Sequence, residues 1–264
     1  MSSSDIYHKT VVRVEVDRLQ IDWKLPFQRQ NVRVVIGTGF FFDEKGHILT
    51  CAHVVEGAYR VLVQIPWKGT KMHVAKIKGV CPNFDIAVLQ IENYKHEHFL
   101  KLGKNIQIDQ GMEATAVGYP LGSQTLKFSK GIVSGKQGLC YQIDTSLNPG
   151  NSGGPLIYNE YVIGINAAGE ENAESINYAV PINKFYLIEK LLVRKQRKLV
   201  HYPLIFGFEQ MQRTTVEFKK YLKNRCEIGG VYINNVIQNT LISKTKLKKG
   251  DILCKLYILC MLNL

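Results

Sequence analysis

The segment Asn148-Pro149-Gly150-Asn151-Ser152-Gly153-Gly154-Pro155 surrounds one serine with three glycines. Glycine adopts backbone conformations that other residues avoid, so a turn of this composition can point its amides inward and let another molecule approach the chain closely. A serine in such a turn is exposed and does not belong to a strand. The segment therefore predicts Ser152 as a candidate nucleophile, although a glycine-rich hairpin without any chemistry has the same composition.

Short segments of β character lie on both sides of this turn, between residues 31 and 180. They are rich in valine, isoleucine, phenylalanine and tyrosine, and glycine, proline and asparagine separate them. Many short strands at near-regular spacing predict a mainly β fold, either a barrel or a sandwich, and argue against βαβ units. The clearest expected strands are 32–42, 59–65, 85–91, 115–119, 127–134, 161–166 and 176–180.

One helix is expected directly after these strands. Pro181 suits the first turn of a helix, and the apolar residues Phe185, Ile188, Leu191 and Leu192 recur on one face. We expect this helix to close the first domain.

A histidine and an aspartate stand at the ends of two apolar segments. In Ile48-Leu49-Thr50-Cys51-Ala52-His53-Val54-Val55 the apolar run ends in small residues before His53, and in Asn83-Phe84-Asp85-Ile86-Ala87-Val88-Leu89 the aspartate opens the run. A carboxylate beside such a run needs a partner, and a histidine N–H is suited to that role. The pattern therefore predicts that Asp85 pairs with His53. The rival acids, each in poorer surroundings, are Asp43, Asp109 and Asp144.

Taken together, these segments resemble the HtrA/Deg family of serine proteases, which have the trypsin-like fold. The resemblance runs from Gly37-Thr38-Gly39-Phe40 to Ile176-Asn177-Tyr178-Ala179-Val180-Pro181-Ile182, which is more than half of the chain. It implies two six-stranded antiparallel β-barrels followed by a C-terminal helix. By this resemblance His53, Asp85 and Ser152 match the catalytic triad, in the chain order of that fold.

The resemblance also implies a reaction and a specificity. The amides of Gly150 and Ser152, with Asn151 between them, match the oxyanion hole. The implied activity is that of a serine endopeptidase that cleaves unfolded or damaged proteins through an acyl-enzyme, with no metal and no cofactor. A chaperone-like or peptide-binding protein with weak or regulated proteolysis is the alternative. The expected pocket for the residue before the cut holds no acid, favours small or medium aliphatic side chains, and is lined by Ser146, Leu147, Ile165, Asn166 and Ala167.

Four regions are expected along the chain. Residues 1–30 form an N-terminal segment, 31–193 the trypsin-like domain, 194–202 a basic linker and 203–264 a partial PDZ-like segment. The last region resembles a PDZ domain that lacks its late elements, which argues against peptide binding of the PDZ type. The resemblance implies a homo-oligomer built on trimers; packing of the N-terminal segment across its own barrel is the alternative. The segments that resemble parts of a PDZ domain are Phe206-Gly207-Phe208, Gly229-Gly230-Val231-Tyr232-Ile233 and Leu247-Lys248-Lys249-Gly250-Asp251-Ile252-Leu253.

Composition and charge limit the remaining possibilities. No apolar run reaches the roughly 18 residues that suggest a membrane span. The start, Met1-Ser2-Ser3-Ser4-Asp5, lacks the features of a secretory signal, so an intracellular location, cytoplasmic or nuclear, is expected. Residues 189–264 hold 15 Lys and Arg against 5 Asp and Glu, which is most of the net charge of +12. No nucleic-acid-binding motif accompanies this charge, so nucleic acid is not the expected partner.

The cysteines and histidines do not indicate a disulfide framework or a metal site. The six cysteines are scattered and form no CxxC pair, so reduced thiols are expected. Cys51 lies two residues before His53, and we expect a small buried residue there because apolar surroundings disfavour a thiolate. His96 and His98 are interpreted as part of a solvated loop, because other metal-ligating residues do not cluster near them in the sequence.

Overall fold

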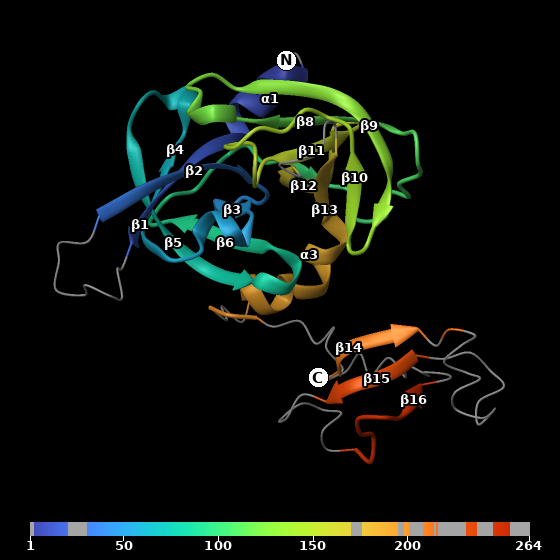
Figure 1. Cartoon of the computed structure of the whole chain (residues 1–264). Helices are drawn as coiled ribbons and strands as arrows, with labels where there is room; N and C mark the ends of the chain where they lie inside the picture. The colour runs from blue at the N-terminus through green and yellow to red at the C-terminus, as the bar shows by residue number, and fades with distance from the viewer. Residues whose placement is uncertain are drawn as a thin grey trace. The chain divides into compact units, whose positions relative to one another are not determined.

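The computed structural model describes residues 3–20, 31–169, 176–194, 198–200, 208–213, 215, 231–236 and 245–253 (Figure 1). The chain divides into two compact units, Met1–His201 and Tyr202–Leu264. Within the described ranges, no helix is long and apolar enough to cross a membrane. The strands of the first unit are β1 (Val11–Gln20), β2 (Asn31–Phe41), β3 (His47–Thr50), β4 (Ala58–Gln64), β5 (Met72–Cys81), β6 (Ile86–Ile91), β7 (Lys101–Leu102), β8 (Glu113–Gly118), β9 (Lys127–Gln137), β10 (Cys140–Ile143), β11 (Pro155–Tyr158), β12 (Tyr161–Gly169) and β13 (Asn177–Pro181). Its α-helices are α1 (Ser3–Thr10), α2 (Ala52–Val55) and α3 (Ile182–Glu189).

The first barrel closes in the strand order β1-β2-β3-β6-β5-β4. Strand β1 pairs along its whole length with β2 and also pairs with β4 on its other edge. Val12, Val14 and Val16 alternate along β1 and are all fully buried, as expected for a strand with one face toward a core. The expected boundary at residue 31 therefore does not match the structure, because β1 lies before it and is a full member of the barrel.

The second barrel consists of β8 to β13. Its order is β11-β8-β9-β10-β13-β12, and pairing of β11 with β12 closes the ring, while the short β7 adds to β12 in parallel. Two closed six-stranded antiparallel barrels confirm the predicted fold class, and the sandwich alternative is wrong. The interior is filled by the buried residues Ile108, Ala114, Ala116, Val133, Tyr141, Ile143, Leu156, Ile163 and Ala179.

Each of the seven expected strands corresponds to an observed one, and β3 is the apolar run before His53, but four further barrel strands were not predicted. Strands β10 and β11 have only four residues each, too few to establish an alternating pattern. Strand β5 carries Lys76 and Lys78 among its apolar residues, so its sequence reads as more polar than a barrel strand. Strand β1 was assigned to a separate N-terminal segment.

The expected helix after the barrels is present. Phe185, Ile188 and Leu192 are fully buried, which confirms three members of the predicted face, whereas the fourth, Leu191, is half-buried. Helix α3 passes into a π-helical turn, η4 (Lys190–Arg194), and Pro181 is the residue that caps its N-terminal end.

Part of the expected basic linker belongs to the first unit. Residues 198–200 lie beside β5, where the Val80 amide donates to the Lys198 carbonyl (2.9 Å) and the Val200 amide donates to the Val80 carbonyl (2.8 Å). The Val200 side chain is buried. The segment is therefore fixed to the first barrel at this point.

The second unit contains an antiparallel sheet of β14 (Phe208–Arg213), β15 (Val231–Val236) and β16 (Ile252–Leu253), in that order. Ile233 of β15 is fully buried and exchanges two hydrogen bonds with the turn before β16, accepting from the Gly250 amide (3.0 Å) and donating to the Asp251 carbonyl (2.9 Å). Phe206, Gly207 and the apolar end of the chain lie outside the described residues. The PDZ-like identity of this unit stays a prediction.

Candidate active site

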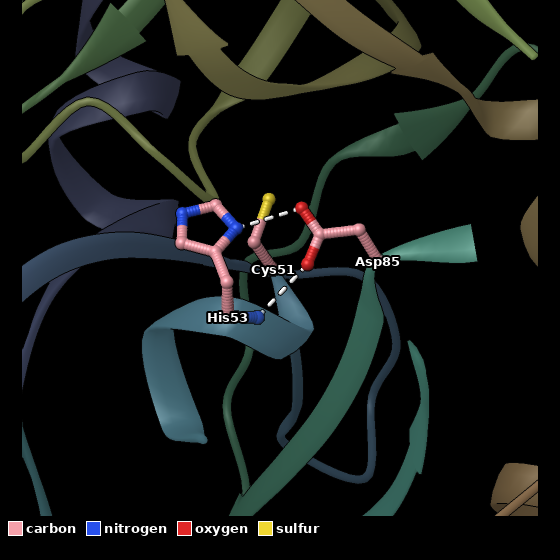
Figure 2. A group of neighbouring side chains, drawn as sticks. All are labelled: Cys51, His53 and Asp85. Carbon is pink, nitrogen blue, oxygen red and sulfur yellow. Dashed lines mark hydrogen bonds and ion pairs between the residues drawn. The ribbon is translucent and has the colours of Figure 1, made fainter. Parts of the chain in front are cut away.

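His53 and Asp85 meet through two hydrogen bonds on the first barrel. The His53 Nδ1 lies 2.7 Å from Asp85 Oδ2, and the His53 backbone amide donates to Asp85 Oδ1 (2.8 Å) (Figure 2). The histidine belongs to α2, which is separated from β3 by Cys51 alone. When the imidazole is neutral, the Nδ1–H donated to this carboxylate leaves Nε2 free to accept a proton.

The backbone around Asp85 explains its orientation. Asp85 ends the 3₁₀-helix η2 (Pro82–Phe84) and has φ 54°, a left-handed conformation that aspartate tolerates better than most residues. Its carbonyl accepts the Ala52 amide (3.1 Å), so its main chain is also bound to α2. Strand β6 starts one residue later than expected, at Ile86, and Asp85 therefore lies in the turn that precedes the strand.

The three rival acids occupy other places. Asp43 binds His47 in a turn, with its Oδ2 2.6 Å from His47 Nδ1. Burial acts to raise the pKa of the Asp43 carboxyl, but the hydrogen bonds from the His47 ring and amide outweigh it, and the pKa lies below its ordinary value. Asp109 lies in an exposed polar turn, where its Oδ1 accepts the Gln107 side-chain amide. Asp144 accepts a backbone amide from strand β9.

The serine turn, residues 148–155, packs against the first barrel. Gly150 and Gly153 have φ of 102° and 89°, which favours glycine at both positions. A Cβ atom on Gly153 would lie 2.1 Å from the Thr38 carbonyl oxygen, so no side chain fits there. The Ser152 hydroxyl is half-buried and donates to the Ala167 carbonyl (2.6 Å), so in this structure its hydrogen bond goes to the main chain of β12 and not to His53.

One carbonyl connects the serine turn to the strand that leads into His53. The carbonyl oxygen of Asn166 accepts the Gly153 amide (2.7 Å) and also the thiol of Cys51 (3.2 Å). Gly153 follows Ser152, and Cys51 precedes His53 by two residues. The fold therefore brings the serine and the His53–Asp85 pair to one region between the two barrels.

The peptide units of the serine turn have fixed orientations. The Pro149 carbonyl accepts the Leu121 amide (2.6 Å), and the peptide bonds of the described residues are trans, so the Gly150 N–H points away from Leu121. The Asn151 amide donates to the Asn148 carbonyl (3.0 Å). Of the three residues expected at the oxyanion hole, Asn151 therefore has its amide engaged within the turn.

The expected pocket residues differ in exposure. Ser146 is exposed and Leu147 is half-buried against the core of the second barrel. Ile165 and Asn166 have no exposed surface, and the Asn166 side chain donates to the Pro155 carbonyl (3.2 Å). Neither side chain therefore reaches the surface, and the role of both residues in the pocket wall stays a prediction. The fifth residue, Ala167, is half-buried and contacts Ser152 through its carbonyl.

Comparison with known proteins agrees with this arrangement. The model of the trypsin-like peptidase domain matches residues 37–165. The serine protease Do-like HtrB of Bacillus subtilis is 32% identical over 238 residues, which cover 81% of this chain and 50% of the relative. The serine protease Do-like HtrA of Lactobacillus helveticus is 30% identical, and the match covers 80% of this chain and 55% of the relative. The chloroplastic Protease Do-like 2 of Arabidopsis thaliana is 31% identical, and the match covers 92% of this chain and 41% of the relative.

The chain belongs to the HtrA/Do family of serine proteases. It spans about half the length of the curated relatives it matches. A solved HtrA-type protease, AlgW with a decapeptide, superimposes with a TM-score of 0.75 over 95% of this chain and 84% of that chain. Its sequence identity is 23%, so this likeness supports the fold alone.

Thr38 binds the serine turn of this HtrA/Do member from the opposite barrel. Its buried Oγ1 accepts the Tyr119 amide (3.0 Å) and donates to the Gly150 carbonyl (2.6 Å), while its backbone amide donates to the Ser152 carbonyl (2.8 Å). Thr38 belongs to the segment that carries the family resemblance, but its residue type alone predicts no role for it. A small hydroxyl residue between two glycines at the start of an apolar run is the signal that points to it.

Arg18 is a second residue that the sequence did not reveal. Its guanidinium donates to the backbone carbonyls of His53 and Val54, the latter at 3.2 Å. These carbonyls lie at the C-terminal end of α2, where a positive charge is favourable. Arg18 thereby binds the short helix that carries His53 to strand β1. Its position on β1 gave no local clue, because that strand was assigned to another region.

Cys51 is unsuited to be the nucleophile of this HtrA/Do chain. The thiol is fully buried, and burial, followed by the nearby Asp85 carboxylate, raises its pKa well above the ordinary value. The thiol therefore stays protonated at neutral pH, as the apolar residues around it in the sequence predict.

The His96–His98 pair is not arranged as a metal site. His96 is buried, with Nδ1 3.1 Å from the Tyr94 hydroxyl and Nε2 2.8 Å from the Lys9 carbonyl. Both ring nitrogens are therefore engaged by the protein. The expectation of a solvated loop is wrong for His96, whose ring stacks on Phe41.

Replacing Gly153 by alanine is expected to lower the free energy of unfolding by about 3 kcal/mol. The left-handed φ and the clash of the new Cβ with the Thr38 carbonyl both contribute to this loss. Gly111→Ala is the matched control, since Gly111 has φ 86° but nothing within 4 Å of the added Cβ. It should cost only about 1 kcal/mol. Urea unfolding of both variants measures the difference. Equal losses would mean that contact with the first barrel does not constrain the serine turn.

Proposed function

We propose that the protein is a serine endopeptidase that hydrolyses peptide bonds of polypeptides through an acyl-enzyme. The observation that supports this most is the two-point contact between Asp85 and His53, joined through the Asn166 carbonyl to the turn that carries Ser152. Membership of the HtrA/Do family supports the same reaction.

In the proposed mechanism, Ser152 rotates its hydroxyl from the Ala167 carbonyl toward Nε2 of His53. Nε2 takes the proton as Oγ attacks the substrate carbonyl, and later gives it to the leaving amine. Asp85 holds the Nδ1–H and stabilises the imidazolium. The amides of Gly150 and Ser152 bind the oxyanion, and such a donor contributes about 10²–10³ in rate. Water then hydrolyses the acyl-enzyme.

The proposed substrates are unfolded or damaged polypeptides with a small or medium aliphatic residue before the cut. The relative AlgW was solved with a decapeptide, which is consistent with peptide substrates here. Ser146, the residue six positions before Ser152, is uncharged, and so is the half-buried Leu147. A pocket without a carboxylate gives a lysine or arginine side chain no partner for its charge.

Incubation with a chemically unfolded protein, followed by mass-spectrometric mapping of the new termini, tests this proposal. We expect internal cleavage, mostly after alanine, valine, isoleucine or leucine, and none with the Ser152→Ala chain as the blank. A substrate that is bound but left intact would contradict an endopeptidase and support a holding protein. Preferred cleavage after arginine would contradict the proposed pocket.

We also propose a homo-oligomer, on the strength of the family resemblance. The N-terminal segment contributes α1 and β1 to its own unit, and the Tyr7 side chain is buried there. The apolar residues Ile21, Trp23, Leu25 and Phe27 lie outside the described residues. Light scattering of the purified chain measures the mass directly, and a monomer would contradict this proposal.

A further inference from the structure

Cys51, His53 and Asp85 form a cluster of three metal-ligating side chains of three chemical kinds. A thiol, an imidazole nitrogen and a carboxylate oxygen all lie within 4.8 Å of one another (Figure 2). Two of the three come from the junction between β3 and α2, and the third comes from the turn before β6. The proposed peptidase reaction uses the imidazole and the carboxylate but assigns nothing to the thiol.

The cluster is open on one side and closed on the other. The side chains of His53 and Asp85 are 42% and 30% exposed, so solvent reaches them. Cys51 has no exposed surface, and its hydrogen bond to the Asn166 carbonyl fixes the sulfur behind the other two. An ion that arrives at the exposed pair therefore meets the sulfur as a third ligand from inside the protein.

We propose that Cys51, His53 and Asp85 form a binding site for a thiophilic divalent cation, Zn²⁺, and that its binding reversibly inhibits the peptidase. Zinc takes thiolate sulfur at about 2.3 Å, imidazole nitrogen at about 2.0–2.1 Å and carboxylate oxygen at about 2.0–2.2 Å. Ligand atoms that already lie within 4.8 Å of one another reach such distances with small side-chain movements. Water completes the coordination, as in zinc sites with three protein ligands.

The chemistry of binding explains the inhibition. Zn²⁺ replaces the thiol proton of Cys51, which leaves to solvent, and the carboxylate of Asp85 binds without losing a proton. A neutral imidazole bound through Nδ1 carries its one proton on Nε2. That nitrogen then has no lone pair to accept the proton of Ser152, so the nucleophile is not activated. The inhibition rests on the proposed function, whereas the binding of the ion does not.

Titration of Co²⁺ into the full-length Ser152→Ala chain tests the binding. Cobalt adopts zinc-like sites, and thiolate coordination gives it a charge-transfer absorption in the near ultraviolet. We expect the absorbance of this band to increase until one equivalent of Co²⁺ per chain has been added, and to disappear when Zn²⁺ replaces the cobalt. In the Ser152→Ala chain, the further substitution Cys51→Ala should abolish the band. The substitution Cys140→Ala in the same chain should leave the absorption band unchanged, because Cys140 is a half-buried free thiol outside the cluster. Circular dichroism confirms that each variant is folded.

A second experiment measures inhibition of peptide hydrolysis, with the chain that retains Ser152. Zn²⁺ should inhibit peptide hydrolysis, and a chelator should restore it. Cys51→Ala should raise the half-inhibitory concentration by at least about 10–100-fold, because even the loss of an outer partner of a metal ligand costs that much affinity. A missing charge-transfer band, or one that survives Cys51→Ala, would overturn the site. Inhibition of equal strength in Cys51→Ala would do the same. A Co²⁺ band in a chain that never cleaves peptides would instead count against the proposed function and leave the site standing.

Discussion

Replacing Ser152 by alanine is expected to lower the turnover of peptide substrates by about 10⁶, as removal of the nucleophile does in serine proteases generally. The hydroxyl is the atom that forms the acyl-enzyme, and alanine has no group that replaces it. Because Ser152 is half-buried and donates only one hydrogen bond, to the Ala167 carbonyl, the fold should tolerate its loss. Hydrolysis of an aliphatic peptide, followed by fluorescence, measures the effect.

The control for this variant is Ser129→Ala, on strand β9 of the same barrel. Its rate should stay close to that of the unchanged chain, since Ser129 takes no part in the serine turn. If the purified Ser152→Ala chain retains more than about one per cent of the activity, where loss of the nucleophile should leave far less, another group is the nucleophile.

Asp85→Asn is expected to lower turnover by about 10⁴, as replacing the triad aspartate by asparagine does in a trypsin-like protease. The geometry gives the reason. The His53 backbone amide needs an acceptor, so the asparagine oxygen should take the place of Oδ1 and the NH₂ group should face Nδ1. Nδ1 must then accept, and the imidazole proton moves to Nε2. The histidine is held in the tautomer that cannot take the proton of Ser152.

The chain supplies a matched control for this substitution. Asp43 binds His47 with the same two contacts, from Oδ1 to the backbone amide (3.0 Å) and from Oδ2 to Nδ1 (2.6 Å). Asp43→Asn therefore disturbs a similar pair outside the serine turn. Its turnover should change by less than a factor of about three, because separate sites usually influence each other by no more than about 0.5 kcal/mol. Comparable losses in both variants would indicate damage to the fold and not a role for Asp85 in the reaction.

The residues that can be predicted from the sequence are those with a strong local signal. Gly150 and Gly153 mark the serine turn because their backbone conformations favour glycine. The small residues before His53 and the apolar run after Asp85 place both side chains at the ends of strands. Each signal lies within a few residues, so no knowledge of the distant partner is needed.

What the sequence missed depends on contacts between distant segments. Strand β1 belongs to the first barrel because β2 and β4 pair with it, and nothing within residues 11–20 specifies those partners. Ile165 and Asn166 were expected to line a wall of the substrate pocket, which stays a prediction; β12 is buried on both faces over 162–166, so alternation along the strand does not separate inner from outer residues. Thr38 acts across the two barrels, and its role appears only when they are assembled.

The most direct test of the central claim is the reaction of the chain with a fluorophosphonate, followed by peptide mass spectrometry to locate the adduct. The reagent is attacked by a serine only when a base removes the proton, so it reports on the pairing of Ser152 with His53 and does not require a known substrate. We predict one adduct, on Ser152, formed at least about 10³-fold more slowly in His53→Ala. An adduct on another residue, or an unchanged rate in His53→Ala, would contradict the account.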